Sequence, residues 1–138
     1  MPDRLEQFPH RQVEQGYLAT GPKGLQVRLR KSGETLSLTY KRDDRGARIE
    51  REVELTPEQF AVLWPATLGR RLTKTRYDVP LGDCVVEIDV YGGKHEGLIV
   101  AEVEFANENS ARSFRPPDWL GPDVTGKPRY SNVRLASE

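Results

Sequence analysis

Residues 25–41 read LQVRLRKSGETLSLTYK, and they carry the clearest structural pattern in the chain. Apolar and polar side chains alternate over Leu25–Arg30 and again over Leu36–Lys41, as they do in a strand with one buried face. The segment between them, residues 31–34, contains Gly33 and has the composition of a turn. The pattern therefore predicts a β-hairpin.

The same alternation returns along most of the chain, with one helical interruption. We expect further strands over residues 49–55, 72–77, 84–91 and 98–105. Residues 56–68 change to helical spacing: Thr56 suits the N-cap, Pro57 suits the first helical position, and Gln59 completes a capping box. Six or seven strands joined by short turns predict an α+β protein, mainly β, whose antiparallel sheet curls into a barrel with a few short helices.

Length and composition narrow the class of protein. We expect a single domain over residues 1–138, with a lead-in over 1–14 and a C-terminal tail over 118–138 that packs on the barrel. Lysine plus arginine and aspartate plus glutamate both number 21, and this zero net charge argues against a non-specific nucleic-acid binder. The longest apolar run is far shorter than a membrane span, and the single cysteine, Cys84, fits a reducing compartment. We therefore expect a cytoplasmic protein that binds neither nucleic acid nor a membrane.

The polar faces of the expected strands carry charges that repeat in sign. Positions i and i+2 of a strand point the same way, so like charges at this spacing share a face. The pairs are Arg28 with Arg30, Glu50 with Glu52, Lys74 with Arg76, Glu87 with Asp89, and Glu102 with Glu104, and Lys41 lies on the polar face of its own strand. A solvated sheet surface is one interpretation, but like charges repel unless something neutralises them.

The other interpretation is that these faces bind a ligand that neutralises both the positive and the negative side chains. Guanidinium and ammonium groups match phosphate oxygens, and paired carboxylates suit Mg²⁺ or Mn²⁺. If the sheet curls with its charged faces inward, the pattern indicates a site for a polyanion together with a divalent metal ion.

Six short motifs occur in an order and spacing that identify a family resemblance. They are Val27-Arg28-Leu29-Arg30, Leu38-Thr39-Tyr40-Lys41, Glu50-Arg51-Glu52, Thr75-Arg76-Tyr77, Glu87-Ile88-Asp89-Val90 and Ala101-Glu102-Val103-Glu104-Phe105. The sequence resembles the CYTH domain family, also called triphosphate tunnel metalloenzymes, from Gln15 to the C-terminus. Tail segments such as Trp119-Leu120-Gly121 are similar to those of the short bacterial members.

The resemblance implies an antiparallel β-barrel whose interior is a tunnel lined by charged side chains. It also implies an enzyme that depends on Mg²⁺ or Mn²⁺ and acts on triphosphates. By this resemblance, the phosphate-binding residues would be Arg28, Arg30, Lys41, Lys74 and Arg76. The metal ligands would be Glu52, Asp89, Glu102 and Glu104, the catalytic residues would be Glu50, Glu52 and Lys74, and Glu87 is a weaker match on the same face as Asp89.

The function that the resemblance implies is hydrolysis of a phosphoanhydride bond. The substrate would be inorganic tripolyphosphate or a nucleoside triphosphate, because the small bacterial members are similar to tripolyphosphatases. A class IV adenylate cyclase is the alternative enzyme, since it must bind the phosphates of its substrate in the same way. A polyphosphate- or nucleotide-binding module with impaired catalysis is the alternative outside enzymes.

One departure from the family pattern lies at the N-terminus. The family carries a Glu-x-Glu-x-Lys motif on its first strand, and residues 1–7 look instead like the loop that follows that strand in relatives. We therefore expect that the natural chain begins upstream of Met1 and that the barrel of residues 1–138 is open where the strand would lie. The missing motif is the reason for the binding-module alternative, and an open edge would favour pairing with a second copy as a homodimer.

Overall fold

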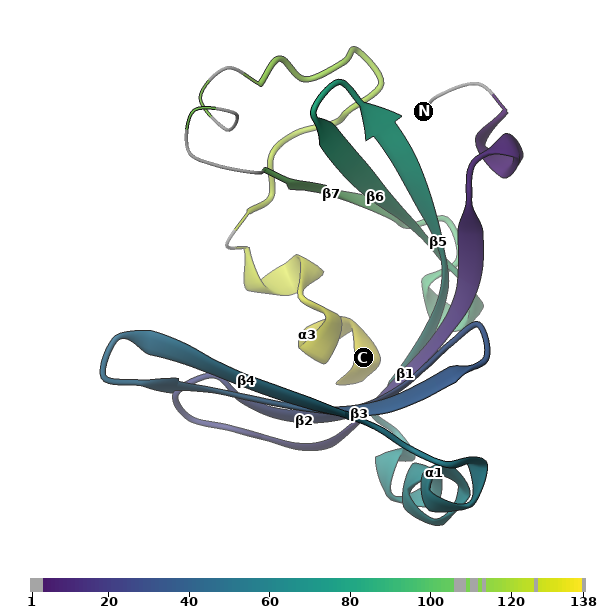
Figure 1. The fold of residues 1–138 in the computed structure, drawn as a ribbon, viewed down its shortest axis with the longest axis vertical. Coiled ribbons are helices and arrows are strands. Elements are labelled where there is room, and N and C mark those ends of the chain that lie inside the picture. The colour runs from purple at the N-terminus through teal and green to yellow at the C-terminus, as the bar shows by residue number, and fades with distance from the viewer. Residues whose placement is uncertain (1–3, 106–108, 110–111, 113, 126, 138) are drawn as a thin grey trace. The chain divides into compact units, whose positions relative to one another are not determined.

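The structure is a computed structural model that describes residues 4–105, 109, 112, 114–125 and 127–137. Its described strands are β1 (His10–Gly21), β2 (Leu25–Ser32), β3 (Thr35–Asp44), β4 (Ala47–Glu54), β5 (Arg71–Leu81), β6 (Cys84–Tyr91) and β7 (Ile99–Glu104). They form a 7-stranded sheet in the order β4-β3-β2-β1-β5-β6-β7 (Figure 1). The terminal strands β4 and β7 each have one neighbour in this order, so the described sheet is open. The mainly β, antiparallel fold predicted from the sequence is confirmed.

The chain forms two compact units. The first unit comprises Met1–Arg11 and Lys74–Lys127, and the second comprises Gln12–Thr73 and Pro128–Glu138. Neither unit is a continuous stretch of sequence, and both β1 and β5 run from one unit into the other. The single domain expected over residues 1–138 stays a prediction, and each unit is described below by itself.

The second unit is built around the β2–β3–β4 meander. Strands β3 and β4 are joined by a two-residue turn. Its central residues, Arg45 and Gly46, both have positive φ, as in a type I′ turn. Gly33 has φ 60° at the first central position of the β2–β3 turn, which glycine tolerates best. Leu29, fully buried, lies in register with Leu38 of β3 and makes the apolar side of this meander.

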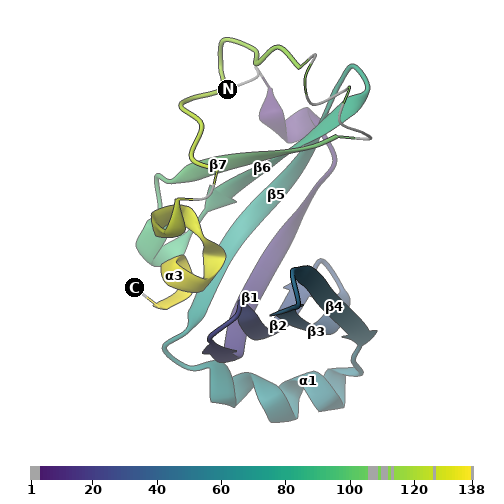
Figure 2. The same ribbon diagram turned by 90° about the vertical axis from the view of Figure 1, so that its left-hand side faces the viewer.

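Two short helices belong to the second unit. Helix α1 (Pro57–Leu63) begins with the predicted capping box, in which Thr56 and Gln59 exchange hydrogen bonds, and Phe60 is its buried residue. It continues as the 3₁₀ helix η2 (Trp64–Thr67), where Pro65 lies. Helix α3 (Asn132–Ser137) buries Leu135 and Ala136 and lies on the other side of β2, β3 and β4 from α1 (Figure 1 and Figure 2).

The first unit has its own apolar core. Val79, Val86 and Ile88 are buried at its centre, on one face of the β5–β6 hairpin. The partly buried residues around them are Leu5, Phe8, Tyr77, Leu81, Val90, Ala101, Val103 and Trp119. The short 3₁₀ helices η1 (Leu5–Gln7) and η3 (Gly93–His95) lie in this unit, and η4 (Pro128–Tyr130) precedes α3 in the second. The tail therefore contributes Trp119 to one core and Leu135 to the other unit.

The strand boundaries differ from the sequence-based ones mainly at the start of the chain. Residues 1–14 were expected to be a lead-in, yet η1 begins at Leu5 and β1 begins at His10. The reason is pairing with a distant strand: Asp78 donates its backbone N–H to the carbonyl of Pro9, and Arg11 forms an ion pair with Asp78. No described helix is both long and apolar enough to cross a membrane.

Candidate active site

One polar face runs across four strands of the second unit. Its members, in register from β1 to β4, are Gln15, Tyr17, Arg28, Arg30, Ser37, Thr39, Lys41, Glu50 and Glu52. On β3 this polar side is the more sheltered one, because Thr39 is only 1% exposed while Leu38 and Tyr40 of the opposite side are half-buried. We call these nine residues the β1–β4 polar face. Four of its members, Gln15, Tyr17, Ser37 and Thr39, are buried, which distinguishes this part of the face from a solvated sheet surface.

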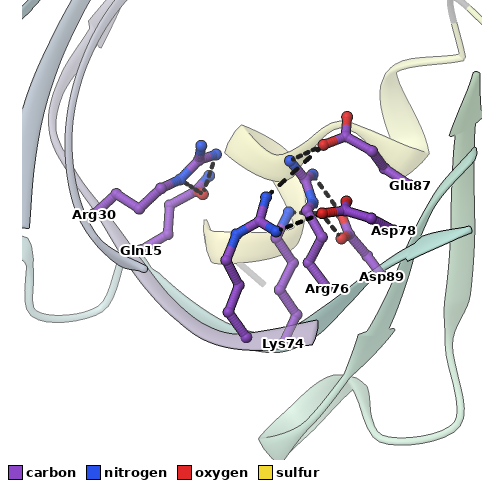
Figure 3. A network of polar contacts seen from close by, with 8 residues as sticks. Gln15, Arg30, Lys74, Arg76, Asp78, Glu87 and Asp89 are labelled. Carbon is purple, nitrogen blue, oxygen red and sulfur yellow. Dashed lines mark hydrogen bonds and ion pairs between the residues drawn. The ribbon is translucent and has the colours of Figure 1, made fainter. Parts of the chain in front are cut away.

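Gln15 lies at the centre of the hydrogen bonds on this face. Its Oε1 atom accepts hydrogen bonds from Arg30 Nε at 3.0 Å and Arg30 Nη2 at 2.7 Å (Figure 3). Its Nε2 atom donates to the Tyr17 hydroxyl at 2.9 Å. Gln15 is completely buried, so both ends of its amide are used inside the protein.

Arg28 contributes positive charge with an unused donor. Its Nε atom is buried and has no hydrogen-bond partner among the described residues. Burial raises the pKa of Tyr17, against the opposing charge of Arg28 and hydrogen bonds to Gln15 and Arg28. A buried guanidinium N–H without an acceptor is costly, and an anionic oxygen would satisfy it.

Lys41 shares the surplus of positive charge on the β1–β4 polar face. Burial, and then the charge of Arg28, lower its pKa, while Glu50 opposes this effect. The Lys41 Nζ atom lies 3.6 Å from a Glu50 carboxylate oxygen, and the Glu50 side chain is exposed. Burial first, and then neighbouring positive charge, therefore lower the pKa of Lys41, and both conditions would favour a bound anion.

The acidic members of the face lie on β4. Glu50 and Glu52 point the same way, as their i and i+2 spacing predicted, and both are exposed. The Thr39 hydroxyl donates to Glu52 Oε1 at 3.0 Å, which fixes one oxygen of that carboxylate.

The first unit holds a second group of charges, centred on Asp89. Lys74 Nζ donates to Asp89 Oδ2 at 2.8 Å, and Arg76 donates through Nε to Oδ1 at 2.7 Å and through Nη2 to Oδ2 at 2.9 Å. Arg76 also contacts Glu87 at 3.2 Å. Arg11 extends the group, because it forms ion pairs with Asp78 and Glu87. We call Arg11, Lys74, Arg76, Asp78, Glu87 and Asp89 the Asp89 network.

The Asp89 network is balanced in charge, and its centre is buried. The Lys74 side chain is 0% exposed and that of Asp89 is 4% exposed. Burial disfavours the charged carboxylate of Asp89, but hydrogen bonds and charges of Arg76 and Lys74 outweigh it and lower its pKa. The hydrogen bond to Asp89 raises the pKa of Arg76, helped by Glu87 and Glu102. The cations Lys74 and Arg76 are therefore held in place by Asp89.

Strand β7 adds carboxylates next to this network. Glu102 is directly opposite Glu87 in the β6–β7 register, is exposed, and raises the pKa of Arg76 by its charge. The backbone of Glu104 pairs with Val85, but the side chain of Glu104 lies outside what the structure describes. The sequence-predicted residues are thus collected into two groups, one in each unit: Arg28, Arg30, Lys41, Glu50 and Glu52 in the second, and Lys74, Arg76, Asp89 and Glu102 in the first.

Comparison with known proteins identifies the family to which this arrangement belongs. The chain is 42% identical over 125 residues to an inorganic triphosphatase of Nitrosomonas europaea, a match that covers 90% of this chain and 83% of that protein. The chain belongs to the triphosphate tunnel metalloenzyme, or CYTH, family. It is also 36% identical over 123 residues to an inorganic triphosphatase of Acetivibrio thermocellus, covering 88% of this chain and 77% of the relative. A scan against models of protein families found no match.

Solved structures place the fold in the same family. The inorganic triphosphatase NE1496 matches with a TM-score of 0.78 and 40% identity, covering 100% of this chain and 91% of that one. A putative adenylate cyclase of Bacillus halodurans matches with a TM-score of 0.55 and 14% identity, covering 75% of this chain and 70% of that one. At that identity the second likeness shows the fold alone. The predicted membership of the CYTH family is confirmed.

Triphosphate tunnel metalloenzymes generally depend on a metal ion, and the carboxylates of this chain fit one of a particular kind. Among the described residues no three His, Cys, Asp or Glu side chains gather around one point. The available donors are pairs, Glu50 with Glu52 and Glu102 with the neighbouring Glu104 position. A hard cation that takes one or two carboxylates and completes its shell with water and substrate phosphate oxygens matches such pairs, and an all-protein cage does not.

Several residues of the site were not expected from the sequence. Gln15 and Tyr17 on the β1–β4 polar face and Arg11 and Asp78 in the Asp89 network carry no like-charge repeat. The alternation along β1 could have indicated Gln15 and Tyr17, because it places them on the same face as Val13. The structure shows all three residues buried. A glutamine at a buried strand position requires partners on neighbouring strands.

Proposed function

We propose that this protein hydrolyses a phosphoanhydride bond of inorganic tripolyphosphate with the help of a divalent cation. The observation that carries the proposal is the surplus of positive charge on the β1–β4 polar face, where Arg28 keeps a buried N–H that has no partner in the part of the chain that the structure describes. Tripolyphosphate supplies several anionic oxygens for such donors. The names of the two relatives, both inorganic triphosphatases, support the same substrate class.

The phosphate-binding roles follow from the charges of each unit. On the β1–β4 polar face, Arg28, Arg30 and Lys41 would bind phosphate oxygens. In the Asp89 network, Lys74 and Arg76 would be the phosphate-binding cations of the first unit, in positions held by Asp89. Because both oxygens of Asp89 already accept hydrogen bonds from these cations, we propose for Asp89 a positioning role in place of the metal-ligand role expected from the sequence.

The metal ion is proposed to be Mg²⁺ or Mn²⁺. Either carboxylate pair, Glu50 with Glu52 in the second unit or Glu102 with Glu104 in the first, would supply ligands to such an ion, since hard oxygen donors suit both ions. When bound, such an ion neutralises phosphate oxygens and lowers the pKa of coordinated water.

The chain's own residues would position the reactants. Glu50 and Glu52 would accept hydrogen bonds from the attacking water, whose oxygen forms a bond to a terminal phosphorus while the bond to the bridging oxygen breaks. The products are orthophosphate and pyrophosphate, and the proton of the water passes to a carboxylate and then to solvent. Arg28, Arg30 and Lys41 would stabilise the negative charge that shifts onto the departing oxygen.

Release of orthophosphate from tripolyphosphate, followed with and without added Mg²⁺ or Mn²⁺, tests the proposal. We expect release that needs the metal and is stopped by EDTA, and Arg28→Ala should reduce kcat/KM by on the order of a hundredfold, since two or three charge-assisted hydrogen bonds are lost. Arg51→Ala, at an exposed position on the opposite face of β4, is the matched control and should retain activity. Absence of release at any metal concentration would refute the proposal.

Three further assignments belong with the proposal. Nucleoside triphosphates are a second substrate class, to be compared in the same assay. A cytoplasmic location fits the single cysteine, Cys84, and fractionation of the native host tests it. A homodimer is proposed because β4 and β7 end the strand order and offer edges for pairing, and sedimentation at several concentrations tests it.

A further inference from the structure

Gln15 is a buried residue whose role neither the charge pattern nor the proposed chemistry assigns. It is 0% exposed and lies on β1, opposite Arg30 of β2 and two residues before Tyr17. Its amide is used at both ends, by Arg30 and by the Tyr17 hydroxyl. A buried polar side chain with all of these contacts is expensive to replace and fixes its neighbours.

The chemistry of Arg30 settles which way the Gln15 amide faces. An arginine side chain donates hydrogen bonds and accepts none, so the group facing Arg30 must be the amide oxygen. The amide NH₂ therefore faces the Tyr17 hydroxyl, 2.9 Å away. In this contact the Tyr17 oxygen accepts a hydrogen bond from Gln15, and its own hydrogen is left for an acceptor other than Gln15.

The contact with Arg30 has a separate consequence. Arg30 donates through Nε and Nη2 to the same Gln15 oxygen, which fixes the plane of the guanidinium. Its remaining N–H group at Nη1 and the outer edge of Nη2 then have a defined direction on the β1–β4 polar face. A guanidinium held in advance binds phosphate with less loss of rotamer freedom than one that must be ordered on binding.

We propose that Gln15 is a positioning residue of this site. It orients Arg30 for phosphate binding and keeps the Tyr17 hydroxyl hydrogen free for a substrate oxygen or the attacking water. The proposal rests on the triphosphatase function proposed above and names a residue through which that function depends on β1.

Two substitutions separate the two contacts. Gln15→Met keeps the length of the side chain and removes both contacts. Gln15→Glu keeps an acceptor for Arg30 but removes the donor, so the Tyr17 hydroxyl would donate its hydrogen to the new carboxylate. Gln12→Glu is the matched control, because Gln12 lies on the same strand with an exposed side chain and receives the same added charge.

The experiment measures kcat and KM for tripolyphosphate and records the Arg30 Nε–H signal by ¹H–¹⁵N NMR without ligand. For Gln15→Met we expect a KM raised and a kcat lowered, each on the order of tenfold, and loss of the protected Arg30 signal. For Gln15→Glu we expect the Arg30 signal to persist while kcat falls by a similar factor. Gln12→Glu should match the parent in all three quantities.

Other outcomes would overturn the proposal. Values of kcat and KM within twofold of the parent in both Gln15 variants would do so, and so would a loss explained entirely by a smaller folded fraction, with KM and the Arg30 signal unchanged. A parent chain that releases no phosphate would refute the proposed function instead. The Arg30 signal and the affinity for tripolyphosphate, measured by calorimetry, would then decide the role of Gln15 without turnover.

Discussion

Asp89 holds and neutralises the buried cations of the first unit. It accepts hydrogen bonds from both Lys74 and Arg76 while almost completely buried. Asp89→Asn should reduce the free energy of unfolding by about 3–5 kcal/mol, because it leaves two buried cations with too little negative charge. Urea unfolding measures the change, with Asp83→Asn in the exposed β5–β6 turn as the control. An unchanged midpoint for Asp89→Asn would contradict this account of the network.

The lowered pKa of Asp89 also predicts how stability depends on pH. A carboxyl whose pKa is lower in the folded than in the unfolded protein stabilises the fold above its unfolded pKa, about 3.9. That stabilisation is lost as the pH falls from about 5 through the lower, folded-state value. Thermal unfolding between about pH 3 and pH 7 should show a steeper acid loss for the parent than for Asp89→Asn, whose neutral amide does not titrate. Parallel curves would be the contrary result.

On the β1–β4 polar face, Lys41 is the residue whose shifted pKa predicts a dependence on pH. Burial and the charge of Arg28 lower its pKa, so it loses its proton at a lower pH than an ordinary lysine, whose pKa is about 10.4. If Lys41 binds phosphate, KM for tripolyphosphate should rise as the pH approaches that lowered value. Lys41→Arg keeps its charge and should move the rise to higher pH. Identical pH profiles of KM for the two proteins would remove Lys41 from the binding site.

At the scale of the element, α1 offers a test that separates stability from function. Thr56 and Gln59 form a reciprocal cap at its N-terminus. Thr56→Ala should lower the free energy of unfolding by about 1 kcal/mol and leave kcat and KM unchanged, since the cap lies apart from the residues of the β1–β4 polar face. Thr56→Ser, which keeps the hydroxyl, should unfold like the parent. Loss of activity in a fully folded Thr56→Ala would require α1 to take part in the site.

The elements also show what local sequence could predict. Strands β2 and β3 were predicted because their alternation is carried by neighbouring residues, and α1 because its cap and first turn are local. The first residues of β1 were not, because their strand conformation depends on Asp78, far away in the sequence. Helix α3 was not predicted either, since six residues give too short a window for a helical period.

For the site as well, only features that depend on neighbouring residues could be predicted. The shared face of Arg28 and Arg30 was predictable, because side-chain direction alternates along any strand. The partners were not, because register between strands decides that Asp89 faces Arg76 and that Gln15 faces Arg30. The family resemblance assigned Asp89 to metal binding, and the cross-strand register shows in addition that Asp89 accepts hydrogen bonds from two cations.

At the scale of the whole molecule, membership of the triphosphate tunnel metalloenzymes is consistent with charged groups in both units. Each unit presents several cations on its strands and a pair of carboxylates on another strand of the same unit. The described residues hold no three carboxylates around one point, so a metal ion bound by one carboxylate pair would complete its shell with water and substrate phosphate oxygens. Tight metal binding should therefore require triphosphate, and titration of Mn²⁺ by calorimetry with and without tripolyphosphate checks this.

A crystal structure of the protein with tripolyphosphate and a divalent cation would test the central claim most directly. The account predicts phosphate oxygens within hydrogen-bond distance of Arg28, Arg30 and Lys41, with Arg28 Nε now supplied with an acceptor. Tripolyphosphate bound only at the exterior of the sheet, with those three side chains unchanged and still without contact to it, would contradict the account.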